Sequence, residues 1–234
     1  MRFLKLKMTH RRDDGSPMRS PIVVDAPRKY APDSARTHKA LCKRKCQLLM
    51  GAHDSGKTRW LSRIHNAHYE IYGKVATPVF LSGLQPILTW TDQPHVIEWH
   101  NHSDNVTPWK ALNQHQRAER IADYLTETKA ILYLDDAHKL TGRKCQIARQ
   151  CLLSAKIWLM TTSDENRLPP NIRTLVESRE PQRTRLQTEA SYDNTVLFMW
   201  LLAAILAMAG AWEAATVLAG LTALGSGRRS ARAD

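Results

Sequence analysis

Short apolar runs alternate along the chain with longer stretches that have helical periodicity. Four runs predict buried β-strands, at 46–50, 78–82, 130–136 and 156–162. Helices are predicted between them at 57–72, 110–129 and 142–155. Strands that alternate with helices favour a mainly parallel sheet with helices on both faces, so the predicted fold class is α/β.

Three further segments have a weaker pattern. Residues 34–45 predict a short basic helix that leads into the first strand of the sheet. The polar and aromatic stretch that follows residue 83 predicts one more short strand at 95–99, and a fifth strand of the main sheet is predicted at 183–187.

Residues 195–225 differ from the rest of the chain, because Glu213 is their one charged residue. This composition is typical of a transmembrane or re-entrant membrane segment. Three arrangements remain open: a single tilted span, a hairpin that turns near Gly210, or an apolar helical hairpin packed on the sheet or on another subunit. Trp200 and Trp212 are candidate interfacial anchors, and a basic tail follows at 226–234.

The formal net charge of +12 is concentrated near the start of the chain, where residues 1–46 hold 13 Lys and Arg against 4 Asp. Residues 1–39 have little apolar periodicity, so they are predicted to form a disordered basic arm, followed by a domain at 40–190. The arm's charge would attract DNA phosphates or anionic lipids. No C-x-x-C pair or third metal ligand accompanies the cysteines and histidines, which disfavours a metal site built from them.

The sequence GAHDSGKT at 51–58 has the spacing of a phosphate-binding loop between a strand and a helix. Gly51 and Gly56 would let backbone N–H groups turn toward phosphates, Lys57 would reach the β- and γ-phosphates, and the Thr58 hydroxyl would bind magnesium. The residues predicted to bind the nucleotide are Gly51, Ala52, His53, Asp54, Ser55, Gly56, Lys57 and Thr58.

A second motif, LYLDDAH at 132–138, places two carboxylates at the end of the strongest predicted strand. Ligands bind at the carboxyl ends of strands in open α/β sheets. Asp135 would therefore hold magnesium, and Asp136 would orient or deprotonate the attacking water. The alternative is a buried strand followed by an acidic turn.

These two motifs, with the strand that ends at 161–163, resemble the AAA+ and related P-loop ATPases. The string DDAHKL resembles the DEAH-type Walker B of transposition and secretion ATPases related to TniB and ExeA, over roughly residues 40–190. The resemblance implies that Thr162 or Ser163 is a polar sensor of the nucleotide. It also implies that Arg173 or Arg179 is an arginine finger acting in a homo-oligomer. The alternative, which the abundance of arginine in this chain favours, is that each is an ordinary surface charge.

Two departures from that family matter. Asp136 stands where the family usually has glutamate, so slow hydrolysis is expected. The helical lid with its second sensor arginine is replaced by the apolar segment, which argues against an ordinary ring motor.

The preferred hypothesis is a membrane-associated ATPase that binds and hydrolyses ATP with magnesium to drive or gate a partner, as in secretion or phage assembly. It would lie on the cytoplasmic face of a bacterial inner membrane, with lipid or a membrane protein as its partner. One alternative is a soluble, cytoplasmic, DNA-associated AAA+ ATPase of transposition or replication. Another is a slowly hydrolysing, nucleotide-gated switch. ATP is favoured over GTP because no guanine-binding N-K-x-D motif follows the second motif.

Overall fold

The computed structural model describes residues 2–11, 15, 17–27, 32–52, 55–73, 77–103, 107–187, 194–213 and 216. The chain divides into two compact units, Met1–Thr188 and Glu189–Asp234. Each unit is described by itself.

A five-stranded sheet forms the centre of the first unit, with the strand order β5-β6-β7-β4-β8 and every neighbouring pair parallel. Its strands are β4 (Gln47–Met50), β5 (Pro78–Ser82), β6 (Ile131–Asp135), β7 (Ile157–Thr162) and β8 (Gln182–Arg185). The prediction of a mainly parallel sheet is confirmed, and its four apolar runs each contain one of these strands. The fifth strand, β8, begins and ends earlier than predicted.

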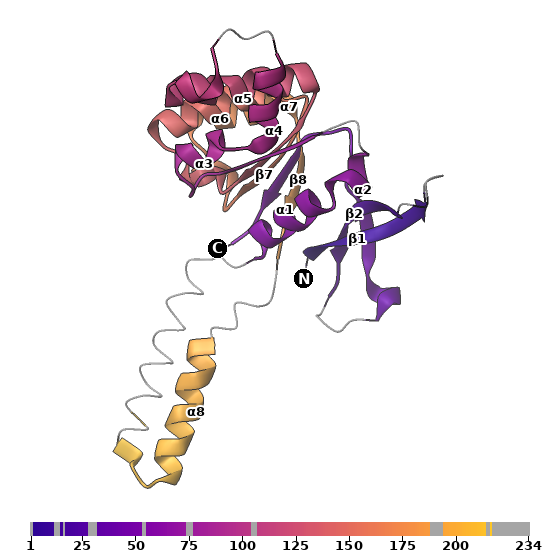
Figure 1. Ribbon diagram of the computed structural model, residues 1–234. Helices are drawn as coiled ribbons and strands as arrows, with labels where there is room; N and C mark the ends of the chain where they lie inside the picture. Colours follow the sequence, from indigo (N-terminus) through magenta and orange to yellow (C-terminus); the bar gives the residue numbers. More distant parts are fainter. Residues whose placement is uncertain are drawn as a thin grey trace. The chain divides into compact units, whose positions relative to one another are not determined.

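Two apolar clusters lie on opposite faces of this sheet, because neighbouring side chains of each strand point to opposite sides. One face is covered by α1 (Lys57–Asn66) and α2 (His68–Tyr72), as Figure 1 shows. The other cluster lies beneath the helices between β5 and β6 and between β6 and β8. These are α3 (Ile87–Thr91), α4 (Pro94–His102), α5 (Gln114–Thr128), α6 (Gly142–Ser154) and α7 (Pro170–Arg179).

Short 3-10 helices join several of these elements: η1 (Asp33–Ala35), η2 (Trp109–Ala111), η3 (Ala137–Lys139) and η4 (Glu165–Arg167). Because η2 occupies the start of the helix predicted at 110–129, α5 begins later than predicted. Asn113 accepts a hydrogen bond from the Gln116 backbone N–H, and the Gln116 side chain accepts one from Asn113 N–H. This capping box fixes the start of α5 after η2.

The predicted strand at 95–99 is wrong, since these residues belong to α4. Pro94 occupies the first turn of the helix, where its missing N–H costs nothing, and Val96 and His100 are buried one turn apart. The aromatic and β-branched residues that suggested a strand serve helix packing instead, with the Trp99 ring 5.5 Å from the Tyr124 ring of α5.

The prediction of a disordered basic arm at 1–39 is also wrong. β1 (Arg2–Arg11), β2 (Pro17–Asp25) and β3 (Thr37–Ala40) form an antiparallel sheet in the order β1-β2-β3. The predicted helix at 34–45 is likewise replaced by η1 and β3. Leu4, 1% exposed, and Val23 join the apolar cluster of α1 and α2, so this sheet belongs to the same compact unit as the predicted domain at 40–190.

The second unit contains α8 (Asn194–Met208), which ends where Gly210 takes a left-handed conformation with φ of 83°. Several large apolar side chains of this unit are exposed, namely Trp200, Leu201, Ile205, Met208 and Trp212. Among the described residues, no helix combines the length and the apolar character that crossing a membrane requires. The second arm of the predicted hairpin is described only at residues 211–213 and 216, and the basic tail at 226–234 lies outside the described residues.

Candidate nucleotide site

The loop between β4 and α1 requires glycine at two positions. A Cβ on Gly51 would lie 2.9 Å from the Leu186 carbonyl oxygen, closer than real Cβ atoms approach backbone. Gly56 has φ of +80°, a left-handed conformation that strains other residues. The loop therefore passes close to the chain after β8 and then turns directly into α1. Two residues predicted to bind the nucleotide, His53 and Asp54, lie outside the described residues.

Lys57 is the first residue of α1 and is 7% exposed. Its Nζ donates hydrogen bonds to the carbonyl oxygens of Gly51, at 2.8 Å, and Ala52, at 2.6 Å, and lies 3.4 Å from Ser55 Oγ. The loop thus wraps around the ammonium group at the N-terminal end of α1. The first backbone N–H groups of that helix point out of its N-terminal end, so cation and helix dipole both favour an anion here.

Asp135 joins three elements at the carboxyl end of the sheet. Its Oδ1 accepts hydrogen bonds from Thr58 Oγ1 on α1, at 3.3 Å, and from Thr161 Oγ1 on β7, at 2.5 Å. The carboxylate is 3% exposed, and its burial raises its pKa, with a smaller contribution from the neighbouring Asp136. The two hydroxyl hydrogen bonds oppose this shift without cancelling it.

Asp136 adopts a left-handed backbone conformation, with φ of 49° and ψ of 46°. Its N–H donates to Thr161 Oγ1 at 2.9 Å, so Thr161 contacts both residues of the acidic pair. A Cβ on Gly83 would lie 2.4 Å from the Asp136 carbonyl oxygen, which means that only glycine allows β5 to end so close to this turn. The sequence reasoning missed both Gly83 and Thr161.

The end of β7 also places Thr162, Ser163 and His138 together. The Thr162 hydroxyl is fully buried and donates to the Asp164 carbonyl oxygen at 2.7 Å. Ser163 N–H donates to His138 Nδ1 at 3.4 Å, whereas Ser163 Oγ is buried without a hydrogen bond among the described residues. Burial lowers the pKa of His138, which favours the neutral imidazole, and Nδ1 accepts the Ser163 N–H. His138 was not among the predicted site residues, although it lies within the second motif.

The two predicted arginine fingers contact other parts of the fold. Arg173 lies 3.8 Å from Glu177 within α7, and Arg179 Nη2 donates to the Leu153 carbonyl oxygen near the end of α6, at 3.1 Å. Within the described part of the chain, neither contacts the phosphate-binding loop. A finger acts on a neighbouring subunit, so its role in an oligomer stays a prediction.

The residues brought together fit a nucleoside triphosphate with magnesium. A hydroxyl and a carboxylate oxygen, Thr58 Oγ1 and Asp135 Oδ1, stand 3.3 Å apart, and oxygen donors of this kind suit a hard divalent cation. The enclosed ammonium of Lys57 and the start of α1 supply the positive side of the same site. Strand, loop and helix therefore have the arrangement of an α/β fold of the P-loop type.

No protein-family model and no curated protein matches this chain. Solved structures similar to it include Cdc6p from Pyrobaculum aerophilum, at 17% identity and a TM-score of 0.39 over 60% of this chain and 38% of that one. Another is a STAND protein (signal transduction ATPase with numerous domains) with a tetratricopeptide repeat sensor from Pyrococcus horikoshii. It has 16% identity and a TM-score of 0.32 over 68% of this chain and 23% of that one. The chain thus spans well under half the length of either structure.

Proposed function

We propose that this protein binds and hydrolyses ATP with magnesium and couples its nucleotide state to a partner. Lys57 and the first N–H groups of α1 bind the phosphates, and Thr58 with Asp135 holds the metal. Magnesium supplies charge neutralisation on the phosphate oxygens when it is bound. Asp136 lies one residue beyond Asp135, at the strand end, and orients the attacking water.

The observation that carries this proposal is the position of Asp135. Its carboxylate is buried and its pKa is raised. Among the described residues, its hydrogen-bond partners are the hydroxyls of Thr58 and Thr161 and the Asp136 backbone, and none is a cationic side chain. A buried carboxylate without a positive partner opposes folding. Such a group is explained if a cation arrives with the ligand, and Thr58 provides the second oxygen for that cation.

Thr161 connects the acidic pair to the strand that ends in the predicted sensor. Because its hydroxyl contacts both Asp135 and the Asp136 N–H, a shift of β7 changes the position of both. Ser163 fits a sensor better than Thr162, since Thr162 already donates its hydroxyl proton to Asp164 O. We propose Ser163 as the group whose hydroxyl responds to the γ-phosphate.

Steady-state hydrolysis by the full chain tests the proposed activity. ATP turnover is expected with magnesium, and a drop of roughly 100-fold or more is expected when EDTA removes the metal. Turnover that persists in EDTA would contradict the assigned roles of Thr58 and Asp135. The absence of both hydrolysis and binding of a fluorescent ATP analogue would contradict the proposal as a whole. Turnover below detection with normal ATP binding would instead favour the nucleotide-gated switch.

We further propose that the second unit contacts lipid. Trp200, Leu201 and Ile205 of α8 are each about half exposed, and Met208 and Trp212 are more exposed still. A run of large apolar side chains on a polar protein marks a contact with a membrane or a partner. The pair of tryptophans at either end of the run is typical of residues at a membrane interface.

Vesicle flotation with uncharged phosphatidylcholine checks this assignment. The Leu201→Asp variant is expected to bind vesicles at least roughly tenfold more weakly, because a charge in the apolar face costs about 2.5 kcal/mol or more in lipid. Leu153→Asp is the matched control, since Leu153 is also an exposed leucine, at 47%, on α6 of the first unit. Equal flotation of the two variants would refute lipid contact by α8.

A further inference from the structure

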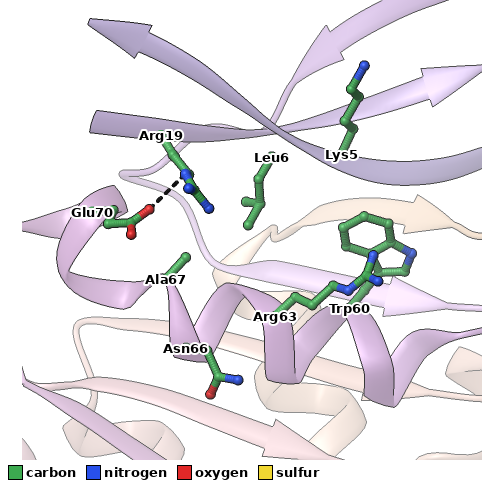
Figure 2. A pocket seen from close by; sticks show the side chains of 8 residues that line it. All are labelled: Lys5, Leu6, Arg19, Trp60, Arg63, Asn66, Ala67 and Glu70. Atoms are coloured by element: carbon green, nitrogen blue, oxygen red, sulfur yellow. Dashed lines mark ion pairs between the residues drawn. The ribbon is translucent and has the colours of Figure 1, made fainter. Parts of the chain in front are cut away.

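A hollow of about 420 Å³ lies between the three-stranded sheet and the helices α1 and α2. Figure 2 shows its lining: Lys5, Leu6, Arg19, Trp60, Arg63, Asn66, Ala67 and Glu70. Its volume lies within the range of small-ligand sites, and its lining combines an aromatic ring, apolar side chains and polar groups. The sheet that forms one wall was not expected from the sequence, so neither was the hollow.

The two sides of the hollow offer different chemistry. On α1 the guanidinium of Arg63 lies over the Trp60 ring, 4.8 Å from its centre, so the two side chains form a cation–aromatic pair. On the opposite side Arg19 Nε lies 2.9 Å from Glu70 Oε2, and both side chains are partly exposed. Leu6 lies between these pairs in Figure 2. A flat ring would therefore meet a cation–aromatic pair on one side and an ion pair on the other.

The described residues from 2 to 73, which include the whole lining of the hollow, hold more cations than carboxylates. Among described residues from 2 to 73, each carboxylate forms an ion pair with an arginine: Asp25 with Arg2, Asp33 with Arg36 and Glu70 with Arg19. No described carboxylate in this stretch is left for the exposed cations Lys5, Lys7, Arg59 and Arg63. Lys5 and Arg63 line the hollow, whereas Lys7 on β1 and Arg59 on α1 lie outside its lining, which suits a polyanion that continues beyond the rim.

We propose that this hollow binds one base of a single-stranded polynucleotide, with Trp60 as the stacking surface and Lys5 and Arg63 near the backbone phosphates. Aromatic rings within a basic surface are the usual means of holding single strands without reading their sequence. A duplex fits poorly, because its bases are stacked on one another and none is free to enter the hollow. A free nucleotide would leave the cations beyond the rim unused.

Trp60 also connects this site to the phosphate-binding loop. Its backbone N–H donates to the Gly56 carbonyl oxygen at 2.9 Å, and a Cβ on Gly56 would lie 3.8 Å from Trp60 Cδ1 in the ring. A base stacked on Trp60 thus lies one helical turn from Lys57. The inference goes beyond the proposed ATPase, and strand binding is measured without ATP or magnesium so that the two can fail separately.

Fluorescence anisotropy of labelled 20-nucleotide oligomers, one of deoxyuridine and one of uridine, tests the inference with the full chain. Trp60→Leu is expected to weaken binding roughly tenfold, whereas Trp60→Phe, which keeps an aromatic face, should stay within about threefold of the unmodified protein. The double variant Lys5→Gln with Arg63→Gln should lower the salt slope by about 1.4, because each phosphate that a cation neutralises contributes about 0.7. Binding of either oligomer alone supports the site and identifies its sugar.

The matched control is Arg143→Gln with Arg149→Gln, which removes two exposed arginines from α6, and it should leave the salt slope unchanged. Thermal melting of every variant separates a binding defect from a folding defect. The inference is overturned if duplex DNA binds more tightly than the single-stranded oligomers. It is also overturned if neither oligomer binds. It is also overturned if Trp60→Leu weakens binding of a fluorescent ATP analogue and leaves strand binding unchanged, since the ring would then serve the nucleotide.

Discussion

The Asp135→Asn variant is expected to lose ATP hydrolysis by about 100-fold or more while keeping, or raising, the melting temperature of the protein. The loss follows because an amide is a much weaker magnesium ligand than a carboxylate. The kept or raised melting temperature follows from the direction of the pKa shift of Asp135. Burial raises the pKa of Asp135 in the folded protein, so its contribution to stability is present below the pKa of an exposed aspartate and is lost as pH rises through the folded value.

At neutral pH the ionised Asp135 therefore opposes folding, and the neutral amide removes that penalty. Asparagine also keeps hydrogen-bond partners, since the hydroxyls of Thr58 and Thr161 both accept and donate. The measurement pairs steady-state hydrolysis with thermal melting in EDTA at pH 7. Asp123→Asn, an exposed carboxylate 3.2 Å from Arg120 on α5, is the control and should change neither. A large fall in melting temperature for Asp135→Asn would mean that the carboxylate serves the fold and not the ligand.

The main sheet could be predicted because its strands are buried on both faces. In β6, Leu132 and Leu134 face one apolar cluster and Tyr133 faces the other, so the strand is a continuous apolar run that the sequence displays directly. The helix at 94–102 could not be predicted in this way. Its aromatic residues are explained by tertiary packing against α5, which local propensity does not contain.

The three-stranded sheet escaped prediction for a different reason. The charged side chains of Lys5 and Lys7 alternate with Leu4 and Leu6 along β1, and the high charge of the whole segment masked this alternation. Its pairing also depends on distant residues. The backbone of Arg2 exchanges hydrogen bonds with that of Gln187, at 2.6 and 3.0 Å, and these two residues lie near opposite ends of the unit's sequence.

The sequence predicted those parts of the candidate site whose residues are adjacent in the chain, but not those that depend on the register between strands. The phosphate-binding loop and the acidic pair were found because each is a short motif at the end of an apolar run. Which of Thr161, Thr162 and Ser163 contacts Asp135 depends on side-chain alternation in β7, and only the structure shows that it is Thr161. Gly83 meets the acidic turn because Ser82 pairs with Asp135, a register that the sequence does not reveal.

The Lys57→Ala variant is expected to lower ATP hydrolysis by about 100-fold to 1000-fold and to weaken ATP binding. The ammonium is 7% exposed inside the loop, so the variant removes a cation from a place that water and salt screen poorly. The same change removes the hydrogen bonds to the carbonyl oxygens of Gly51 and Ala52. We therefore expect the loop to lose order as well as charge, which steady-state hydrolysis and binding of a fluorescent ATP analogue would record together.

Arg59→Ala separates these effects from a general loss of positive charge near the helix start. Arg59 lies two residues further along α1 and its side chain is exposed, so its removal should change hydrolysis by less than about threefold. Equal losses in Lys57→Ala and Arg59→Ala would show that the field of the basic surface, and not the enclosed ammonium, attracts the nucleotide. A large loss in Lys57→Ala alone is the result expected for a phosphate held inside the loop, where the enclosed ammonium both binds it and orders the loop around it.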